Sequence, residues 1–340
     1  MAATVYDVAQ KAEVSVGTVS RYLNGYQLRE SNRLRVEQAI GELGFKGNIL
    51  ARGLKRKRSM AIALVTPDFD IFVTSITTVI EQTLEHERYS LIICDYQKDK
   101  DVLKRKLSFL QDRYIDGVIL FPSNLAGASR EILQKYISKK IPVVLVDHLI
   151  AGIETDAVII DNMNASFRAV EELIRHNHRN IAIIGGRPDS LVSQERLRGY
   201  YNAMQTYDLP VNEEWVVWGD FTQTGGYQAM KKLCASADRP TAVYVTNYAM
   251  TIGAVLALHK IQLRIPEDMS LIGFDPFESF ELIEPTLTVV EQPIDLIAQN
   301  VVRLLLKRIR REYSDFASTI KLNTRMVIGN SVKTLTSQGG

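Results

Sequence analysis

Short apolar runs alternate with segments of helical periodicity over most of the chain, and this alternation constrains the fold more than any other feature. The first runs, from residue 60, are MAIALVT, SLIICD, GVILF and PVVLVD, with helical patterns near 71–88, 100–113 and 127–139 between them. Such alternation predicts parallel strands whose connecting helices cover a central sheet.

A second series of the same kind follows in the sequence. Its runs are AVIID (157–161), NIAIIGG, WVVW, TAVYVTN, MSLIGFD and LTVVEQP, with helical patterns near 162–177, 190–207, 223–236 and 248–260. We therefore predict a pair of similar, doubly wound α/β lobes. A long helix at 294–311 and a strand-like segment, TIKLNTRMVIG, complete the pattern.

Length and composition indicate a soluble protein of several domains. The 340 residues exceed the size at which a single core keeps growing, and 46% of them are hydrophobic. No uninterrupted apolar run approaches the ~18 residues needed to cross a bilayer, so no membrane partner is expected. The segment MAATVYDVAQ has no basic stretch followed by an apolar one, which predicts a cytoplasmic protein. Cys94 and Cys234 are expected to be buried, reduced thiols.

Basic charge is concentrated at the amino terminus. Residues 1–60 contain eleven Lys or Arg against five Asp or Glu, a net +6, whereas the whole chain carries +2, which leaves −4 for the remainder. A segregated basic segment is the electrostatic footprint of a module that displaces counterions from a phosphate backbone. We therefore expect double-stranded DNA as a partner of the first sixty residues.

The same sixty residues carry the pattern of three short helices. Thr4 and Asp7 form a cap-like pair before an apolar face at Val5, Val8, Ala9 and Ala12. After a tight turn, Ser15 is placed to cap a second helix, Val16 to Leu23, in which Val16, Val19 and Leu23 are expected to pack inward. A third helix is expected to begin at a Ser31 cap and to end at Gly44. Two helices joined by a three-residue turn predict a helix-turn-helix unit, and Gly17 and Arg21 share another face of its second helix.

The segment TVYDVAQKAEVSVGTVSRYLNG, residues 4–25, resembles the amino-terminal signature of the lactose-repressor/galactose-repressor family, as does ARGLKRKRS at 51–59. The resemblance implies that Val16, Gly17 and Arg21 face base edges in the major groove. Arginine suits guanine because its fork matches O6 and N7 together, whereas valine offers only apolar contact, for instance to a thymine methyl. The residues for which the resemblance mostly implies phosphate contacts are Thr4, Tyr6, Ser15, Thr18, Ser20 and Asn24.

The stretch after the third helix is apolar and basic, FKGNILARGLKRKRS, and only marginally helical by itself. In the family it is the hinge, which folds when two copies meet in the minor groove. Asn48 is placed to cap it, and Leu54 matches the position that acts as a wedge between base pairs. An apolar wedge unstacks a base step and kinks the duplex.

The resemblance covers essentially the whole chain and extends to periplasmic sugar-binding proteins of type I. It implies a helix-turn-helix head at 1–47 and a hinge helix at 48–58. The amino-terminal lobe is then formed by 59–161 and 291–320, and the carboxy-terminal lobe by 162–290 and 321–332. Three crossing strands would form the hinge between the lobes.

Polar residues at the carboxyl ends of strands are the candidates for ligand binding, because ligands of doubly wound lobes sit there. By matching position the family implies effector roles for Phe72, Asp147, Arg198, Phe221, Asn247, Asp275 and Gln292. Two departures from the family bear on the ligand. Asn247 is followed by Tyr248 where an aspartate is usual, and the first loop carries Asp68 and Asp70. A sugar or sugar derivative is expected, and because Phe221 also suits a purine, a nucleobase remains open.

We therefore expect a ligand-responsive transcriptional regulator, a repressor that binds a palindromic operator as a homodimer. The alternative is a two-lobed solute-binding or sensor protein without a DNA-reading role. A phosphorylated protein as corepressor also stays open because of Arg303, Lys307 and Arg308. An enzyme is not expected, since the sequence contains neither GxxxxGK[ST] nor HExxH, and His176 and His178 have no ligand cluster to complete a metal site. No cofactor is expected.

Overall fold

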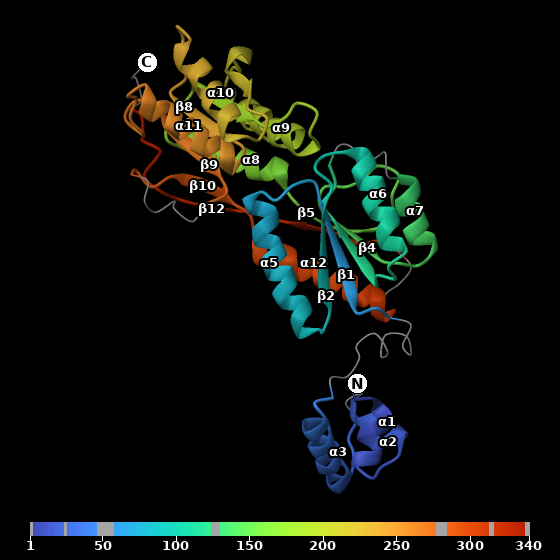
Figure 1. The fold of residues 1–340 in the computed structure, drawn as a ribbon. Helices are drawn as coiled ribbons and strands as arrows, with labels where there is room; N and C mark the ends of the chain where they lie inside the picture. The colour runs from blue at the N-terminus through green and yellow to red at the C-terminus, as the bar shows by residue number, and fades with distance from the viewer. Residues whose placement is uncertain are drawn as a thin grey trace. The chain divides into compact units, whose positions relative to one another are not determined.

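The computed structural model describes residues 3–23, 26–45, 58–123, 130–276, 284–312 and 316–336. The chain forms two compact units, Met1–Ser59 and Met60–Gly340, and each has its own core. Figure 1 labels most of the helices and strands of both.

The first unit is a bundle of three helices: α1 (Val5–Lys11), α2 (Val16–Leu23) and α3 (Glu30–Leu43). The predicted cap of α1 is confirmed, because Thr4 and Asp7 form a reciprocal capping box. The predicted Ser31 cap is wrong, since α3 already begins at Glu30 and its N-cap, Arg29, makes no side-chain cap. Gly44 ends α3 in the left-handed conformation, at φ 57°, as predicted.

The core of this unit includes one residue that the sequence assigned to the following stretch. Phe45 is buried directly after Gly44, because the left-handed turn directs the chain back over the helices. The buried apolar residues of the unit are Val8, Ala9, Ala12, Val19, Val36, Ala39 and Phe45. A core built from all three helices fixes the position of α2.

The second unit begins with a fully parallel sheet of six strands. In spatial order they are β11 (Thr319–Leu322), β5 (Asp156–Ile160), β4 (Val143–Asp147), β3 (Gly117–Leu120), β1 (Ala61–Thr66) and β2 (Ser90–Asp95). Helices α5 (Ile71–His86) and α12 (Ile294–Arg310) cover one face, and α6 (Lys100–Gln111) and α7 (Arg130–Ser138) cover the other (Figure 1).

The second sheet has the same plan with one antiparallel edge. Its order is β12 (Arg325–Val327), β10 (Thr288–Glu291), β9 (Ser270–Phe274), β8 (Ala242–Val245), β6 (Ile181–Gly185) and β7 (Val216–Trp218), and β12 runs antiparallel to β10. Helices α8 (Asn162–Arg175) and α9 (Leu191–Thr206) pack on one face, and α10 (Gln223–Ala235) and α11 (Tyr248–Lys260) pack on the other. A short 3-10 turn, η2 (Glu213–Trp215), precedes β7.

The chain crosses between the two sheets three times, at 160–162, 291–294 and 322–325. As a result α12 and β11 belong to the first lobe although they follow the second lobe in the sequence. A part-buried ion pair holds this return, with Arg308 Nε donating to Asp156 Oδ2 of β5 at 2.7 Å. The prediction of a helix-turn-helix unit followed by two α/β lobes is confirmed.

Three smaller expectations can be compared with the structure. Cys94 and Cys234 are buried free thiols, as predicted. Of the two histidines that were not expected to bind a metal, His176 caps the end of α8, and His178 is fully buried, where its ring nitrogens contact Thr241 Oγ1 and the Lys333 carbonyl. Burial lowers the pKa of His178 to about 4. Among the described residues, no helix combines the length and apolar character that a membrane span requires.

Candidate functional site

The exposed face of α2 is the first candidate site. Val19 is fully buried, whereas Gly17 and Arg21 are exposed, and Val16 is 37% exposed. The expectation that Val16 packs inward is therefore wrong. Val16 is the first residue of α2, and because side chains tilt toward a helix's N-terminus, its side chain extends past the end of the helix. The exposure of Val16 agrees with the outward role that the family resemblance implies.

Hydroxyl groups surround the start of α2. Ser15 Oγ accepts from the Thr18 backbone N–H at 3.1 Å, which confirms the predicted cap, and the two hydroxyls lie 2.9 Å apart. Tyr6 on α1 is 74% exposed, whereas the Thr4 hydroxyl donates to Asp7 Oδ2. Ser20 is half-buried. The predicted contact residues Asn24, Asn48 and Leu54 lie outside the described residues, as does the predicted hinge at 48–58 except for its last residue.

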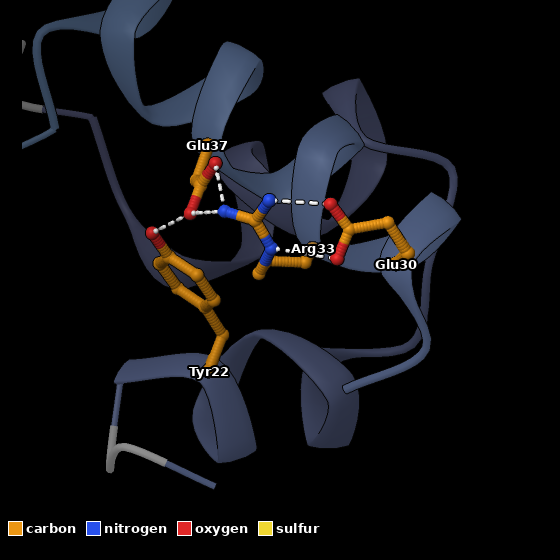
Figure 2. Close-up of polar contacts among 4 residues, drawn as sticks. All are labelled: Tyr22, Glu30, Arg33 and Glu37. Atoms are coloured by element: carbon orange, nitrogen blue, oxygen red, sulfur yellow. Dashed lines mark hydrogen bonds and ion pairs between the residues drawn. The ribbon is translucent and has the colours of Figure 1, made fainter. Parts of the chain in front are cut away.

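A polar network fastens α2 to α3 (Figure 2). The Tyr22 hydroxyl donates to Glu37 Oε1 at 3.0 Å, and Arg33 donates both to Glu37 and to Glu30. Burial, and then the hydrogen bond to Glu37, raises the pKa of Tyr22. Arg33 is therefore neutralised within the unit, whereas Arg21 forms no ion pair with a carboxylate in the part of the chain that the structure describes. The network leaves Arg21 as the cation that α2 presents to solvent.

The second candidate site is a cavity of about 290 Å³ between the lobes of the second unit. It lies at the carboxyl ends of the strands, where ligands of such folds bind. Asp147 ends β4 and Asp275 directly follows β9, and both have left-handed backbones, with φ 78° and 60°. Six of the seven predicted effector residues line this cavity: Phe72, Asp147, Phe221, Asn247, Asp275 and Gln292.

The seventh, Arg198, is wrong. It lies on the exposed side of α9 and does not line the cavity, whereas Arg196 does and is 5% exposed. Successive helical residues are rotated by about 100°, so two positions move a side chain to the other side of the helix. Helical periodicity distinguishes the two arginines, because Arg196 lies four residues after the buried Val192 and four before the buried Tyr200.

Arg196, Asp275 and Gln292 form the inner wall of the cavity. Arg196 lies over the Phe274 ring at 3.7 Å, and it donates to Asn162 Oδ1 at 2.9 Å and to the Thr246 carbonyl at 2.5 Å. Gln292 Nε2 donates to Asp275 Oδ2 at 2.8 Å. Withdrawal from water raises the pKa of Asp275 to about 6, which outweighs the opposing effects of Arg196 and Gln292.

The wall contributed by the first lobe is acidic. Asp70 caps α5, where its Oδ1 accepts from Val73 N–H at 2.8 Å, and Asp68 pairs with Lys98 at 2.6 Å. Asp147 Oδ2 lies 3.2 Å from His148 Nδ1. Burial, and then the neighbouring charges of Asp68 and Asp147, raises the pKa of Asp70. The sequence had marked Asp68 and Asp70 only as a departure from the family pattern, and Lys98 and His148 were missed.

The wall contributed by the second lobe combines an aromatic ring with capped helix ends. Phe221 has φ 67° and packs over Gly186, where any Cβ would overlap its ring. Asn247 caps α11 by accepting from Met250 N–H at 3.1 Å. The segment after β6 also brings Arg187 to the cavity, in a bidentate pair with Asp189.

Comparison with known proteins gives matches along the whole chain. Residues 4–48 match the family described as bacterial regulatory proteins, lacI family, and residues 170–332 match the periplasmic binding protein-like domain. The catabolite control protein A of Priestia megaterium is 32% identical over 98% of this chain and 100% of its own length. The ribose operon repressor of Escherichia coli K12 is 33% identical over 90% of this chain and 93% of its own. A solved complex of the transcriptional regulator CelR with cellobiose is 28% identical, with a TM-score of 0.72 over 97% of this chain and 99% of that one.

Proposed function

Because the chain belongs to the lacI family of bacterial regulatory proteins, we propose that α2 reads a DNA operator while a small effector in the interlobe cavity adjusts the affinity for it. The protein then acts as a transcriptional repressor and not as an enzyme. The observation that carries the proposal is the exposed face of α2 on an otherwise closed three-helix core.

Each exposed group of α2 suits one kind of DNA contact. Arg21, which no carboxylate neutralises among the described residues, matches the two acceptors of a guanine in the major groove. Val16 offers apolar contact to a thymine methyl, and Gly17 permits close approach. The side chains proposed to position the unit on phosphates are Thr4, Tyr6, Ser15, Thr18, Ser20 and Asn24.

Two copies of the chain are proposed to read a palindrome together. In this arrangement residues 1–47 form the head, 48–58 form a hinge helix, and Asn48 caps the hinge. Leu54 of each copy enters the minor groove, where an apolar wedge favours a flexible step at the operator centre. A change in the angle between the lobes alters the spacing of the two hinges. Coupling of this kind typically amounts to about 1–3 kcal/mol, or 5–150-fold in affinity.

A sugar or sugar derivative fits the cavity best. Carboxylates such as Asp147 and Asp275 accept from neighbouring hydroxyls, and Phe221 covers an apolar ring face. The names of two similar proteins, the ribose operon repressor and the CelR–cellobiose complex, point to the same chemistry. A nucleobase is the second candidate, because the Phe221 ring can equally stack on a purine.

The test is fluorescence anisotropy with palindromic duplexes selected from a random library. We expect salt-dependent binding that prefers the selected sites, and deletion of residues 1–58 should abolish it. A solute-binding protein without a DNA-reading role would bind selected and random duplexes equally weakly. That result would overturn the proposal.

A pair of arginine variants separates base reading from general attraction. Arg21→Ala should cost about 1–3 kcal/mol on a selected site and relax the preference at one base pair. Arg35→Ala removes the same charge from the exposed surface of α3. It should weaken selected and random duplexes alike. Equal sequence preference in both variants would contradict the role of Arg21.

A further inference from the structure

We propose that the effector is an uncharged polyol of monosaccharide size, and that the cavity rejects its phosphorylated or oxidised, anionic forms. This inference rests on the proposed function of the cavity and narrows it. The protein would therefore detect its effector before any kinase phosphorylates it, because the product of a kinase would carry the negative charge that the site excludes.

The cations that line the cavity are already engaged. Lys98 pairs with Asp68 at 2.6 Å, and Arg187 makes a bidentate pair with Asp189. Arg196 is held by Asn162 Oδ1 and the Thr246 carbonyl, and its charge also faces Asp275. An anionic ligand would have to compete with Asp68 for Lys98 and with Asp189 for Arg187, and at Arg196 it would meet the neighbouring carboxyl of Asp275.

The remaining carboxylates form an acidic lining from both lobes. Asp70 and Asp147 come from the first lobe and Asp275 from the second, and none of the three forms an ion pair with Lys or Arg among the described residues. The Asp147 carboxylate lies 3.2 Å from the ring of its neighbour His148. A phosphate ester adds a charge of about −1.5 to −2 at neutral pH. Such a ligand would be repelled by the carboxylates of both walls.

The helix ends at the cavity carry side-chain caps as well. Free N–H groups at a helix N-terminus are a common binding site for phosphate. Here α5, α9 and α11 begin at the cavity, and each is capped by its own side chain, Asp70, Ser190 and Asn247 respectively. Each cap occupies one of the N–H donors that a phosphate would use.

Among the described residues that line the cavity, two buried polar atoms lack a hydrogen-bond partner: Gln292 Oε1, which is an acceptor, and His148 Nε2, which accepts or donates according to its tautomer. Gln292 is 5% exposed, its Nε2 donates to Asp275, and its Oε1 has no hydrogen-bond partner in the described part of the chain. A buried acceptor without a donor is costly, so the site requires a donor from the ligand. Hydroxyl groups supply donors to Gln292 and to the carboxylates, and they also accept from Asn247 Nδ2 or from Arg196.

Cavity size and aromatic lining set the scale of the ligand. A volume of about 290 Å³ lies at the small end of ligand sites. Phe72 from one lobe and Phe221 from the other provide apolar surface for the C–H faces of a ring. One sugar ring or cyclitol therefore fits these observations better than a longer chain.

Isothermal titration calorimetry on the full chain tests the inference with matched probes. The neutral set is ribose, arabinose, xylose, glucose, galactose, mannose and myo-inositol. The anionic set is ribose 5-phosphate, glucose 6-phosphate, gluconate, glucuronate and inositol monophosphate, and hypoxanthine represents nucleobases. We expect saturable binding by at least one neutral polyol, with its anionic counterpart at least about 100-fold weaker. Tighter binding by an anion or by hypoxanthine, or no binding by any neutral member, would overturn the inference.

Charge-neutral variants test the cause of the selectivity. Asp70→Asn and Asp147→Asn each remove one carboxylate, and asparagine at position 70 can still cap α5. Each should lower the ratio between the affinity for the neutral polyol and the affinity for its phosphate by about tenfold or more. Asp238→Asn, which changes an exposed aspartate outside the cavity, should leave this affinity ratio unchanged. An unchanged affinity ratio in both cavity variants contradicts the electrostatic explanation.

DNA binding by the same preparations separates the two levels of the proposal. If the protein binds selected duplexes and its affinity for them responds to an anion, only the proposal of a neutral effector is rejected. If no selective DNA binding occurs, the regulatory function itself fails, whatever the calorimetry gives.

Discussion

At the residue scale, the interlobe cavity depends on backbone conformations that most residues avoid. Asp147, Asp220, Phe221 and Asp275 all have φ between 56° and 78°. Residues other than glycine seldom adopt this region, and such strain tends to gather at functional sites. The left-handed turns at the strand ends direct the carboxylates and the aromatic ring toward the cavity.

Gly186→Ala should weaken effector binding without unfolding the protein. A Cβ at this position would overlap the Phe221 ring, so the ring must move from its place in the cavity wall. We expect the affinity for the neutral effector to fall by about tenfold or more, which corresponds to about 1.4 kcal/mol. Calorimetry gives the affinity, and circular dichroism checks the fold. Unchanged affinity would show that Phe221 does not contact the ligand.

Asp275→Asn should remove a specific part of the pH dependence of stability. The pKa of Asp275 is raised to about 6 from 3.8, so the folded protein holds this proton more tightly than the unfolded chain does. The stability that the proton confers is fully present below pH 3.8 and is lost as pH rises through 6. Between pH 7.5 and pH 5, the wild-type protein should therefore gain about 1 kcal/mol relative to the variant.

Urea unfolding at the two pH values measures this difference. Asp238→Asn provides the comparison on the same lobe, and it should follow the wild-type pH profile. Parallel profiles for wild-type protein and Asp275→Asn would rule out the raised pKa.

At the scale of single elements, helical periodicity explains both a success and an error of the sequence analysis. The capping box of α1 and the glycine end of α3 follow from local spacing, and both are present. The choice of Arg198 ignored the spacing of buried residues along α9, which selects Arg196. One face of a helix is fixed by its sequence, provided that its apolar positions are used to define that face.

Gly41→Ala should stabilise α3. Gly41 is inside this helix, and a Cβ added there would meet no atom within 4 Å. Alanine lowers the entropy of the unfolded chain without creating a clash, so the first unit should gain about 0.5–1 kcal/mol. Thermal unfolding of the full chain, followed by helical circular dichroism, checks this value. A loss of stability would mean that α3 packs more closely than described.

At the scale of the whole molecule, the separation of charge corresponds to the separation of proposed tasks. The first sixty residues carry +6 and the rest −4. Counterion release makes DNA affinity fall steeply with salt, by a slope of about 0.9 per neutralised phosphate. The acidic second unit should add little to that slope.

The coupling between the two sites should be reciprocal. If the neutral effector changes the affinity for a selected duplex by some factor, the duplex must change the affinity for the effector by the same factor, within about 5–150-fold. Anisotropy with saturating effector and calorimetry with saturating duplex measure the two factors. Gly186→Ala is the matched control for these measurements, because its DNA affinity in the absence of effector should equal that of the wild-type protein. Unequal factors would exclude a simple equilibrium between two states.

The sequence by itself determined the alternation of strands and helices, the caps of the helices, the basic amino terminus and most of the strand-end residues around the cavity. These features follow from spacing over a few residues, because local periodicity decides which face of an element is buried. Only the tertiary structure decided which charges meet. Lys98 with Asp68, Arg308 with Asp156, and Asp70 facing Asp275 join segments far apart in the chain. Their proximity depends on strand order and on the return of α12 to the first lobe, and no local pattern encodes either.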